Sequence, residues 1–472
     1  RQVLERMVRP RRDLRATSVL AVAISAPIDG AEFLQGIVAA LRPYGRVAVV
    51  TPAQVDADLG RLGTAVAEAA DVGVPRLTEY LHELEIRHDM VVLGVSADDP
   101  DPWVRRATAL ADRVLLVVSS APGEGEWETI RRLVASVPES TTTIAAVHHP
   151  ALTPRPVGSR GLLEEIGADD ILHIRADVAG DLARVARIAT SRSVALVLGG
   201  GGARGFAHLG VYRAMVELGI PIDLIAGSSI GAPLGAGIAR GDTPGEAVAH
   251  NTTGFAGLLD YTIPVVSLIK AERITRAIQT RFGDWDFEDT WIPFRCVSTN
   301  LTRSRVEVHR RGPLAPAVRA SVAIPGIMPP VPWGRDLLVD GGVLNNLPVD
   351  VVAEEGRSST IIAVDVAPAV GPSAHEEFGY SVSGWRALRA GLSRKKSAYP
   401  GIASVLLRSM LVGSIRHRDR LIDEAPVNLL LDLDMRGTGL LDFEQVGSAA
   451  DRGHELAKPL LEAWLEESGG WR

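Results

Sequence analysis

Short runs of hydrophobic residues alternate with amphipathic stretches along the first part of the chain. Five hydrophobic runs have the length of buried strands: Val19–Ile24, Val47–Val50, Met90–Val95, Val114–Val118 and Thr143–Val147. Apolar residues recur at helical spacing in the segments that separate or follow these runs: Ala31–Leu41, Pro75–Ile86, Pro102–Leu110, Trp127–Val137 and Asp177–Thr190. The alternation predicts a parallel sheet with helices on its faces. His149–Gly161 is rich in Pro and Gly and is expected to be a loop.

A second series of predicted strands begins at Val194. Its members are Val194–Leu198, Ile222–Ala226, Arg295–Thr299, Leu337–Asp340 and Thr360–Val366. Helices are expected from about Ala203 to Glu217 and over Phe443–Leu465. Two successive α/β units agree with the length of 472 residues, since one domain usually takes roughly 100–200.

Composition and charge exclude several classes of protein. The net charge of −7 provides no overall basic field to recruit nucleic acid. Cys296 is the single cysteine, which excludes an intrachain disulfide framework and a cysteine-based zinc site and favours a reducing compartment. No apolar run reaches the ~18 residues that span a bilayer. We therefore expect a cytoplasmic location.

Four consecutive glycines, Gly199–Gly202, follow the strand that begins the second unit. Their backbone N–H groups can converge on an anion beside a helix N-terminus, because no side chain blocks the approach. Gly200, Gly202 and Gly205 also match the GxGxxG dinucleotide fingerprint, and Asp223 then stands near the position of the ribose-binding acid. A tight turn without a ligand is the third interpretation.

The next predicted strand ends in Gly227-Ser228-Ser229-Ile230-Gly231, a G-x-S-x-G pattern. The pattern alone is weakly specific, but here it follows a strand and precedes a segment that can open a helix. This context is typical of a nucleophile elbow, in which the flanking glycines permit a sharp turn that exposes the serine. Ser229 is therefore the candidate nucleophile.

The two loops belong to one strand–helix–strand unit, so they are expected at the same edge of the sheet. Glycine-loop N–H groups and the N–H of Ile230 can then hold the oxyanion of an acyl-transfer intermediate. Asp340 ends a further strand and precedes Gly341 and Gly342. We expect it to approach Ser229 from a neighbouring strand, which makes it the candidate base. An ordinary Asp-Gly turn is the alternative for this segment.

Histidines leave a Ser-His-Asp triad open, since the chain has 11 of them. None follows a predicted strand in the way that Ser229 and Asp340 do, and the candidates are His208, His250, His309, His375, His417 and His454. Three acids lie close together at Asp98, Asp99 and Asp101, but the intervening prolines favour a surface turn over a metal site.

The order Gly-Gly-Gly-Ala-Arg-Gly, Gly-Ser-Ser-Ile-Gly, Asp-Gly-Gly resembles the patatin-like phospholipase family, in particular the bacterial type of its neuropathy target esterase branch. The resemblance is strong over 193–370 and weaker elsewhere. It implies hydrolysis of phospholipid or lysophospholipid by a Ser–Asp dyad, without metal or cofactor. Ser229 would be the nucleophile and Asp340 the general base. The residues that match the oxyanion loop and its flanking motifs are Gly200, Gly201, Gly202, Arg204, Gly205, Gly227, Gly231, Gly341 and Gly342.

The residues and the resemblance together imply a domain organisation. Residues 1–16 would link the chain to an upstream segment, where members of this branch often carry a cyclic-nucleotide-binding domain. A degenerate Rossmann-like, non-catalytic α/β domain over 17–190 would precede a patatin-like three-layer α/β/α hydrolase domain over 193–370. Residues 371–472 would form a C-terminal extension that completes the catalytic domain.

A lipid substrate implies contact with a membrane surface, at the inner face for a cytoplasmic protein. Basic and apolar residues are interleaved between Trp385 and Arg420, which predicts a peripheral contact there. Packing of this segment on the hydrolase core is the alternative. Two other functions stay open from the residues alone: a dinucleotide-binding oxidoreductase that uses the GxGxxG loop, and a catalytically silent membrane scaffold.

Overall fold

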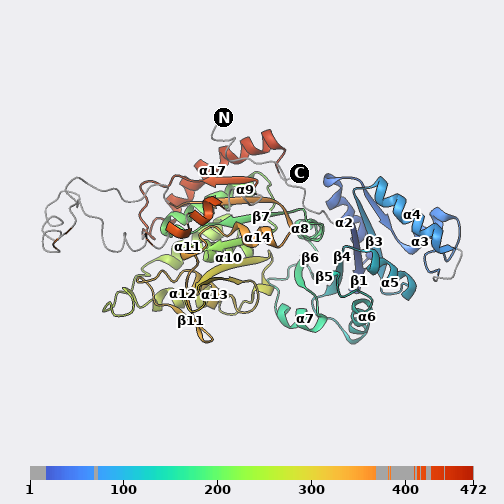
Figure 1. The fold of residues 1–472 in the computed structure, drawn as a ribbon, viewed down its shortest axis with the longest axis horizontal. Coiled ribbons are helices and arrows are strands. Elements are labelled where there is room, and N and C mark those ends of the chain that lie inside the picture. The colour runs from blue at the N-terminus through green and yellow to red at the C-terminus, as the bar shows by residue number, and fades with distance from the viewer. Residues whose placement is uncertain are drawn as a thin grey trace.

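The computed structural model describes residues 18–67, 73–367, 427–440 and 442–470, together with 381, 383, 409, 412–414 and 416–420. Two α/β units lie beside each other, the first in blue to green and the second in green to red (Figure 1). Within the described residues, no helix combines the length and apolar content needed to cross a membrane.

The first unit is a parallel sheet of six strands in the order β2-β3-β1-β4-β5-β6. The strands are β1 (Val19–Ile24), β2 (Val47–Val50), β3 (Met90–Ser96), β4 (Arg113–Ser119), β5 (Thr142–His149) and β6 (Asp170–Arg175). Its α-helices are α2 (Gly30–Leu41), α3 (Pro52–Leu59), α4 (Gly73–Arg87), α5 (Asp101–Leu110), α6 (Glu124–Ala135), α7 (Ser159–Ile166) and α8 (Ala179–Ala189). Separate apolar cores lie on the two faces, one involving α2 and α8 and the other α4 to α7. The predicted parallel sheet covered by helices is confirmed.

Sequence patterning missed three elements of this unit. Helix α7 begins at Ser159, inside the stretch expected to be a loop, and β6 and α3 were not anticipated. Charged residues Asp170 and Arg175 stand at the two ends of β6, and His173 interrupts the apolar residues between them. Asp170 and Arg175 make ion pairs instead of facing free solvent, which the pattern alone does not show.

The second sheet is mixed and has eight strands, in the order β11-β12-β9-β8-β7-β13-β14 with β10 paired to β9. They are β7 (Ser193–Leu198), β8 (Leu224–Ser228), β9 (Phe294–Asn300), β10 (Arg305–His309), β11 (Val331–Trp333), β12 (Asp336–Asp340), β13 (Ser358–Asp365) and β14 (Leu429–Asp432). Strands β9, β8, β7, β13 and β14 are parallel, whereas β10 and β12 run antiparallel to β9.

Helices cover both faces of this sheet and complete three α/β/α layers. They are α9 (Ala207–Glu217), α10 (Gly231–Ala239), α11 (Pro244–Phe255), α12 (Glu272–Phe282), α13 (Leu314–Ser321), α14 (Val349–Glu354) and α17 (Val446–Ser468). The larger core lies under α9, α10 and α17, and the smaller one under α14. Glycines bring α9 and α17 together: a Cβ at Gly210 would lie 2.0 Å from the Ala450 carbonyl oxygen, and one at Gly453 would lie 2.3 Å from that of Ala207.

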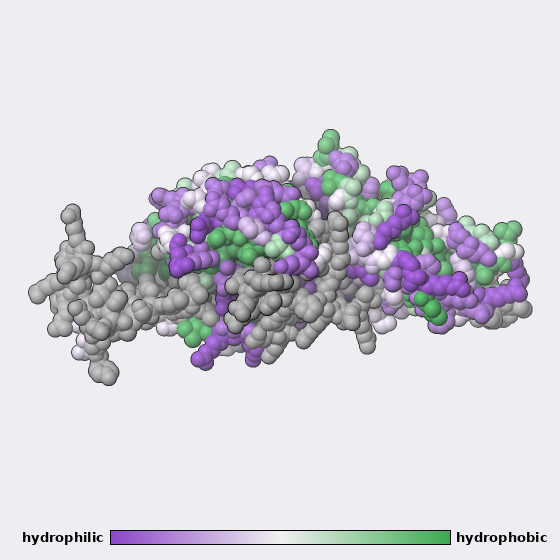
Figure 2. Space-filling view, turned by 90° about the horizontal axis from the view of Figure 1, so that it is seen from above, coloured by the Kyte–Doolittle hydropathy of each residue, from purple (hydrophilic) through white to green (hydrophobic). Residues whose placement is uncertain are grey.

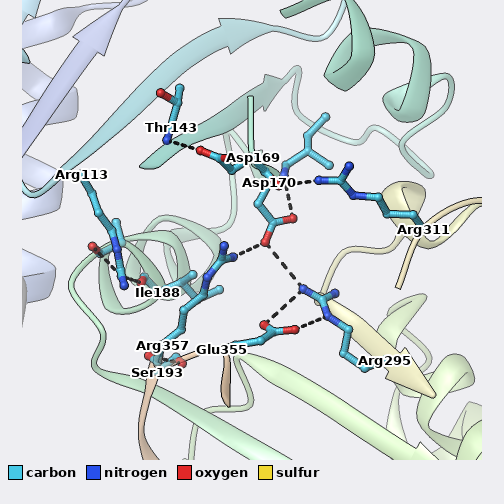
Figure 3. Close-up of polar contacts among 12 residues, drawn as sticks. Arg113, Thr143, Asp169, Asp170, Ile188, Ser193, Arg295, Arg311, Glu355 and Arg357 are labelled. Carbon is cyan, nitrogen blue, oxygen red and sulfur yellow. Dashed lines mark hydrogen bonds and ion pairs between the residues drawn. The ribbon is translucent and has the colours of Figure 1, made fainter. Parts of the chain in front are cut away.

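A largely buried ion network joins the two units (Figure 3). The Asp170 carboxylate, at the start of β6, binds Arg357 and lies 3.6 Å from the Arg295 guanidinium of β9. The Nε of Arg295 also donates to Glu355 at 2.7 Å. Burial alone would raise the pKa of Asp170, but the charges of Arg357 and Arg295 outweigh it and lower the pKa below its usual value. Because a buried charge without its partner is costly, the network fixes how β6 meets β9 and β13.

Candidate active site

Ser229 occupies a sharp turn between β8 and α10. Its φ of 52° lies in the left-handed region, which residues other than glycine adopt only when the surrounding structure constrains them. A Cβ at Gly227 would lie 2.4 Å from the Gly231 carbonyl oxygen, and one at Gly231 would lie 2.2 Å from the Leu198 carbonyl oxygen. Both motif glycines are therefore needed for the turn to close. The strand–turn–helix context predicted for this segment is confirmed.

The Ser229 hydroxyl donates a hydrogen bond to the Asp340 carboxylate, with Oγ and Oδ2 2.7 Å apart. The other oxygen, Oδ1, accepts from the N–H of Gly342 at 2.7 Å. Asp340 is 5% exposed, and burial raises its pKa to about 7 although the hydrogen bonds from Ser229 and Gly342 act in the opposite direction. A carboxyl group with such a pKa can take up and return a proton near neutral pH.

Asp340 reaches Ser229 from β12, which does not neighbour β8. Strand β9 lies between them, with Ser228 opposite Val297 and Asp340 opposite Ser298. The expectation of a base on an adjacent strand was therefore wrong, because β12 runs antiparallel and its end stops beside the middle of β9. Gly341 is needed at this point, since a Cβ there would lie 2.4 Å from the Val297 carbonyl oxygen.

The glycine loop lies directly against Ser229. A Cβ at Gly200 would be 2.9 Å from the Ser229 Cβ and 2.4 Å from the Asn346 Oδ1. The N–H of Gly200 donates to the Asn346 carbonyl oxygen at 3.0 Å. Gly202 has a φ of 59°, and a Cβ there would lie 2.4 Å from the Leu440 carbonyl oxygen. The loop therefore packs too tightly for side chains at these two positions.

Two side chains hold the carbonyl groups of this loop. His208 Nε2 lies 2.8 Å from the Gly199 carbonyl oxygen, and burial lowers the pKa of this histidine to about 4, so its ring is neutral and Nε2 donates. Asn346 Nδ2 donates to the Gly200 carbonyl oxygen at 3.1 Å. The sequence offered one hint of the first contact, since His208 lies one helical turn beyond the loop.

Further contacts brace the site from distant parts of the chain. Ser321, at the end of α13, accepts the N–H of Ser229 on its Oγ at 3.1 Å. Arg204 donates from Nε to the Thr438 carbonyl oxygen at 2.9 Å. Ile230 is buried and fills the space beside Gly205, where a Cβ would lie 2.2 Å from Ile230 Cγ2. Sequence reasoning missed the roles of Ser321 and of the 438–440 segment because no local pattern marks them.

None of the histidines that the structure describes is a hydrogen-bond partner of Ser229 or Asp340. Three of the histidines considered for a triad form hydrogen bonds with other side chains: His250 with Asp242, His309 with Ser298 and His454 with Glu217. His417 lies 4.0 Å from Asp350, and His375 is outside the described residues. The described part of the chain also contains no group of three or more metal-ligating side chains.

The residues expected for a dinucleotide or metal site make other contacts. Both carboxylate oxygens of Asp223 bind the Arg187 guanidinium, and Oδ2 also accepts the N–H of Val194. Asp223 thus belongs to the junction between the two units. Asp99 accepts the N–H of Ser96 at 2.7 Å, as in a surface turn, and Asp101 pairs with Arg132.

Comparisons with known proteins identify relatives of this chain. The family model described as patatin-like phospholipase matches residues 196–353. An uncharacterized NTE family protein of Mycobacterium tuberculosis is 32% identical, over 97% of this chain and 75% of that protein. The patatin-like phospholipase domain-containing protein 6 of Pongo abelii is 31% identical over 97% of this chain, and the lysophospholipase nte1 of Aspergillus fumigatus is 29% identical over 96%. The chain spans 35% and 33% of the length of these two relatives.

The fold, the serine elbow and the family match define a patatin-like phospholipase, an enzyme that hydrolyses acyl esters of lipids. Within that class, the chain belongs to the NTE family.

Proposed function

We propose that the chain releases fatty acid from a phospholipid or lysophospholipid through a Ser229–Asp340 dyad. The observation that carries the proposal is the 2.7 Å hydrogen bond from the Ser229 hydroxyl to a buried carboxylate. Relatives named lysophospholipase and patatin-like phospholipase support the lipid substrate. A hydroxyl is a weak nucleophile on its own, and an adjacent base activates it.

In the first step, Ser229 Oγ attacks the carbonyl carbon of the ester while its proton passes to Asp340 Oδ2. The carbonyl oxygen becomes an oxyanion, which needs hydrogen-bond donors fixed in place beforehand. The N–H groups of Gly201, Gly202 and Ile230 fit this role because no residue in the described structure accepts from them. Gly200 acts instead by its small size, since its N–H already donates to Asn346.

Collapse of this intermediate breaks the ester C–O bond, and the departing alcohol oxygen takes the proton from Asp340. The acyl group then remains on Ser229. A water molecule attacks the acyl carbon in the second step while Asp340 accepts one of its protons. When the bond to Ser229 Oγ breaks, that proton returns to the serine and the fatty acid leaves.

The remaining predicted site residues support this chemistry by shaping the backbone. Gly227 and Gly231 allow the elbow, Gly205 accommodates Ile230, and Gly341 lets Asp340 approach across β9. Arg204 ties the glycine loop to Thr438. The mechanism involves no metal or cofactor, and it gives residues 17–190 no catalytic part. Residues 427–470 complete the catalytic domain over 193–370 in this proposal, since β14 and α17 share its core.

The direct test is lipid-product mass spectrometry with purified chain and a mixed panel of phospholipids and lysophospholipids. We expect free fatty acid and the matching deacylated lipid, and no product with Ser229→Ala. Equal product from wild type and Ser229→Ala would reject the proposal. Quenching or shifting of NAD(P)H fluorescence on titration, with no lipid product, would favour the oxidoreductase instead.

A further inference from the structure

Five large apolar side chains are exposed to solvent in one short segment. The segment connects α11 to α12 (Figure 1). We call residues 261–268 the apolar hairpin. The exposed fractions are 71% for Tyr261, 80% for Ile263, 85% for Val265, 68% for Val266 and 42% for Leu268. No charged residue occurs between positions 261 and 269. Such a run of exposed apolar side chains is costly in water and indicates an interaction surface.

The concentration is unusual for this molecule. Among the described residues, 16 large hydrophobic side chains are exposed, and five of them belong to the apolar hairpin. In the view from above, hydrophobic residues lie in several groups among hydrophilic ones (Figure 2). Single exposed apolar residues such as Leu62 and Ile86 need no special explanation, whereas a cluster does.

Hydrogen bonds give the apolar hairpin a defined shape. Tyr261 and Ile269 form an antiparallel bridge, and the N–H of Thr262 donates to the Leu268 carbonyl oxygen at 3.0 Å. At its base, the Asp260 carboxylate accepts the N–H groups of Ala271 and Glu272, both at 2.9 Å. The apolar side chains are therefore held outward by an ordered backbone.

The base of the apolar hairpin is tied to the segment that also holds the active site. The N–H groups of Leu268 and Ile269 donate to the carbonyl oxygens of Gly326 and Ile327, at 2.9 and 3.0 Å. A few residues earlier, the Ala323 carbonyl oxygen accepts the N–H of Asp340 at 3.0 Å. Ser321, in the same stretch, accepts the N–H of Ser229. Residues 321–327 thus contact the apolar hairpin and both members of the dyad.

We infer that the apolar hairpin inserts into a phospholipid bilayer and brings Ser229 to the lipid surface. The inference rests on the proposed function, because an enzyme that cleaves phospholipid must meet the bilayer near its reactive serine. Aliphatic side chains with one tyrosine suit the boundary between acyl chains and head groups. The absence of charge at 261–269 suits the acyl region, where a charged side chain would be costly.

The local charges also determine how binding responds to salt. The charged residues from 257 to 273 are Asp260, Lys270, Glu272 and Arg273, which sum to zero. Apolar burial, not attraction to anionic head groups, therefore drives the contact, and binding persists at high salt. A contact through the basic 385–420 segment would weaken with salt. In that segment, Arg418 pairs with Asp365 and Asp419, and Trp385 to Lys396 lie outside the described residues.

The test is co-sedimentation with zwitterionic phospholipid vesicles at low and high salt, in a Ser229→Ala background so that no lipid is consumed. The double variant Val265→Asp/Val266→Asp should bind at least about tenfold more weakly, since two apolar side chains leave the bilayer. The matched control is Leu62→Asp/Ile86→Asp, which places the same charges at exposed apolar sites of the first unit. It should bind as the parent does. Equal thermal unfolding midpoints would show that the hairpin variant is folded.

Three outcomes would overturn the inference. The first is a hairpin variant that binds vesicles as tightly as the control. The second is binding that disappears at high salt in the parent protein. The third is a change from dimer to monomer in the hairpin variant by gel filtration, which would assign the surface to a second copy of the chain. Because vesicle binding is measured without turnover, these results are independent of whether Ser229 is the nucleophile.

Discussion

The Ser229 hydroxyl and the Asp340 carboxylate meet at 2.7 Å although β9 separates the strands that carry them. Each residue forms a further hydrogen bond that fixes its position. Ser321 Oγ accepts the N–H of Ser229, and the N–H of Gly342 donates to Asp340 Oδ1. The hydrogen bond therefore depends on the register of three strands. Small changes in that register would separate the two groups.

Replacing Ser229 by alanine should abolish ester hydrolysis and leave the thermal unfolding midpoint nearly unchanged, because only one hydroxyl is removed. A fluorophosphonate probe should label the wild type at Ser229. The matched control is Ser228→Ala, whose hydroxyl donates to the Asn345 carbonyl oxygen and not to Asp340. Labelling should persist in the control and be lost in Ser229→Ala. Persistent labelling of Ser229→Ala would falsify the nucleophile assignment.

The Asp340→Asn substitution should lower kcat by about 10²–10⁴-fold, the usual contribution of a general base, because an amide cannot accept the serine proton. Steady-state kinetics on a lysophospholipid measure this change. Each histidine should also be replaced by alanine in turn. A folded histidine variant with a loss as large as that of Asp340→Asn would identify a triad in place of the dyad.

The pH dependence should follow Asp340, whose pKa is raised to about 7. Only the ionised carboxylate accepts a proton, so kcat/KM should rise with pH and level off above about 7. A profile that stays flat over about two pH units on either side of this pKa would contradict the prediction.

The same raised pKa affects stability. The folded protein holds the Asp340 proton up to a pH of about 7, whereas the unfolded chain releases it near 3.8. The contribution of this group to stability is therefore present below 3.8 and is lost as the pH rises through about 7. Asp340→Asn removes this titration. The thermal unfolding midpoint of the variant, relative to that of the wild type, should therefore increase as the pH rises. Parallel midpoint curves for the two proteins would show that Asp340 titrates normally.

Gly200→Ala should reduce kcat by at least about tenfold, because the new Cβ would meet Asn346 Oδ1 at 2.4 Å and Ser229 Cβ at 2.9 Å. The loop must shift to accommodate it, and the proposed oxyanion donors would shift with the loop. Gly125→Ala is the control, since a Cβ there meets no atom within 4 Å and α6 favours alanine over glycine. Equal kcat values for the two variants would exclude close packing of the loop on Ser229 as a requirement for turnover.

Arg204→Ala should lower kcat more than it changes KM. The reason is that Arg204 holds the glycine loop in place through its hydrogen bond to Thr438 and does not itself contact the lipid in the proposed mechanism. Initial rates over a range of lysophospholipid concentrations separate the two constants. Arg213→Ala serves as the control, since this arginine lies on α9 and pairs with Asp451 on α17. A normal kcat for Arg204→Ala would assign that residue a structural role only.

Local residue patterns determined many of the strands and turns of this protein and several of its candidate site residues. The strand before Gly199–Gly202, the elbow at Ser229 and the Asp340-Gly341 turn were predictable, because each depends on residue types at adjacent positions. The parallel pairing of β7 with β8 followed from a short strand–helix–strand connection.

Contacts between distant segments decided the rest. The antiparallel course of β12, the support of the glycine loop by Thr438 and Leu440, and the link from the apolar hairpin to residues 321–327 join positions far apart in the chain. The hydrophobic period of a segment reports which face is buried, not which segment covers it. The sequence alone could name Asp340 as a candidate base, because the strand end and the two glycines beside it are local features. The packing of the whole core selects which strands pair, so the approach of Asp340 across β9 required the tertiary structure.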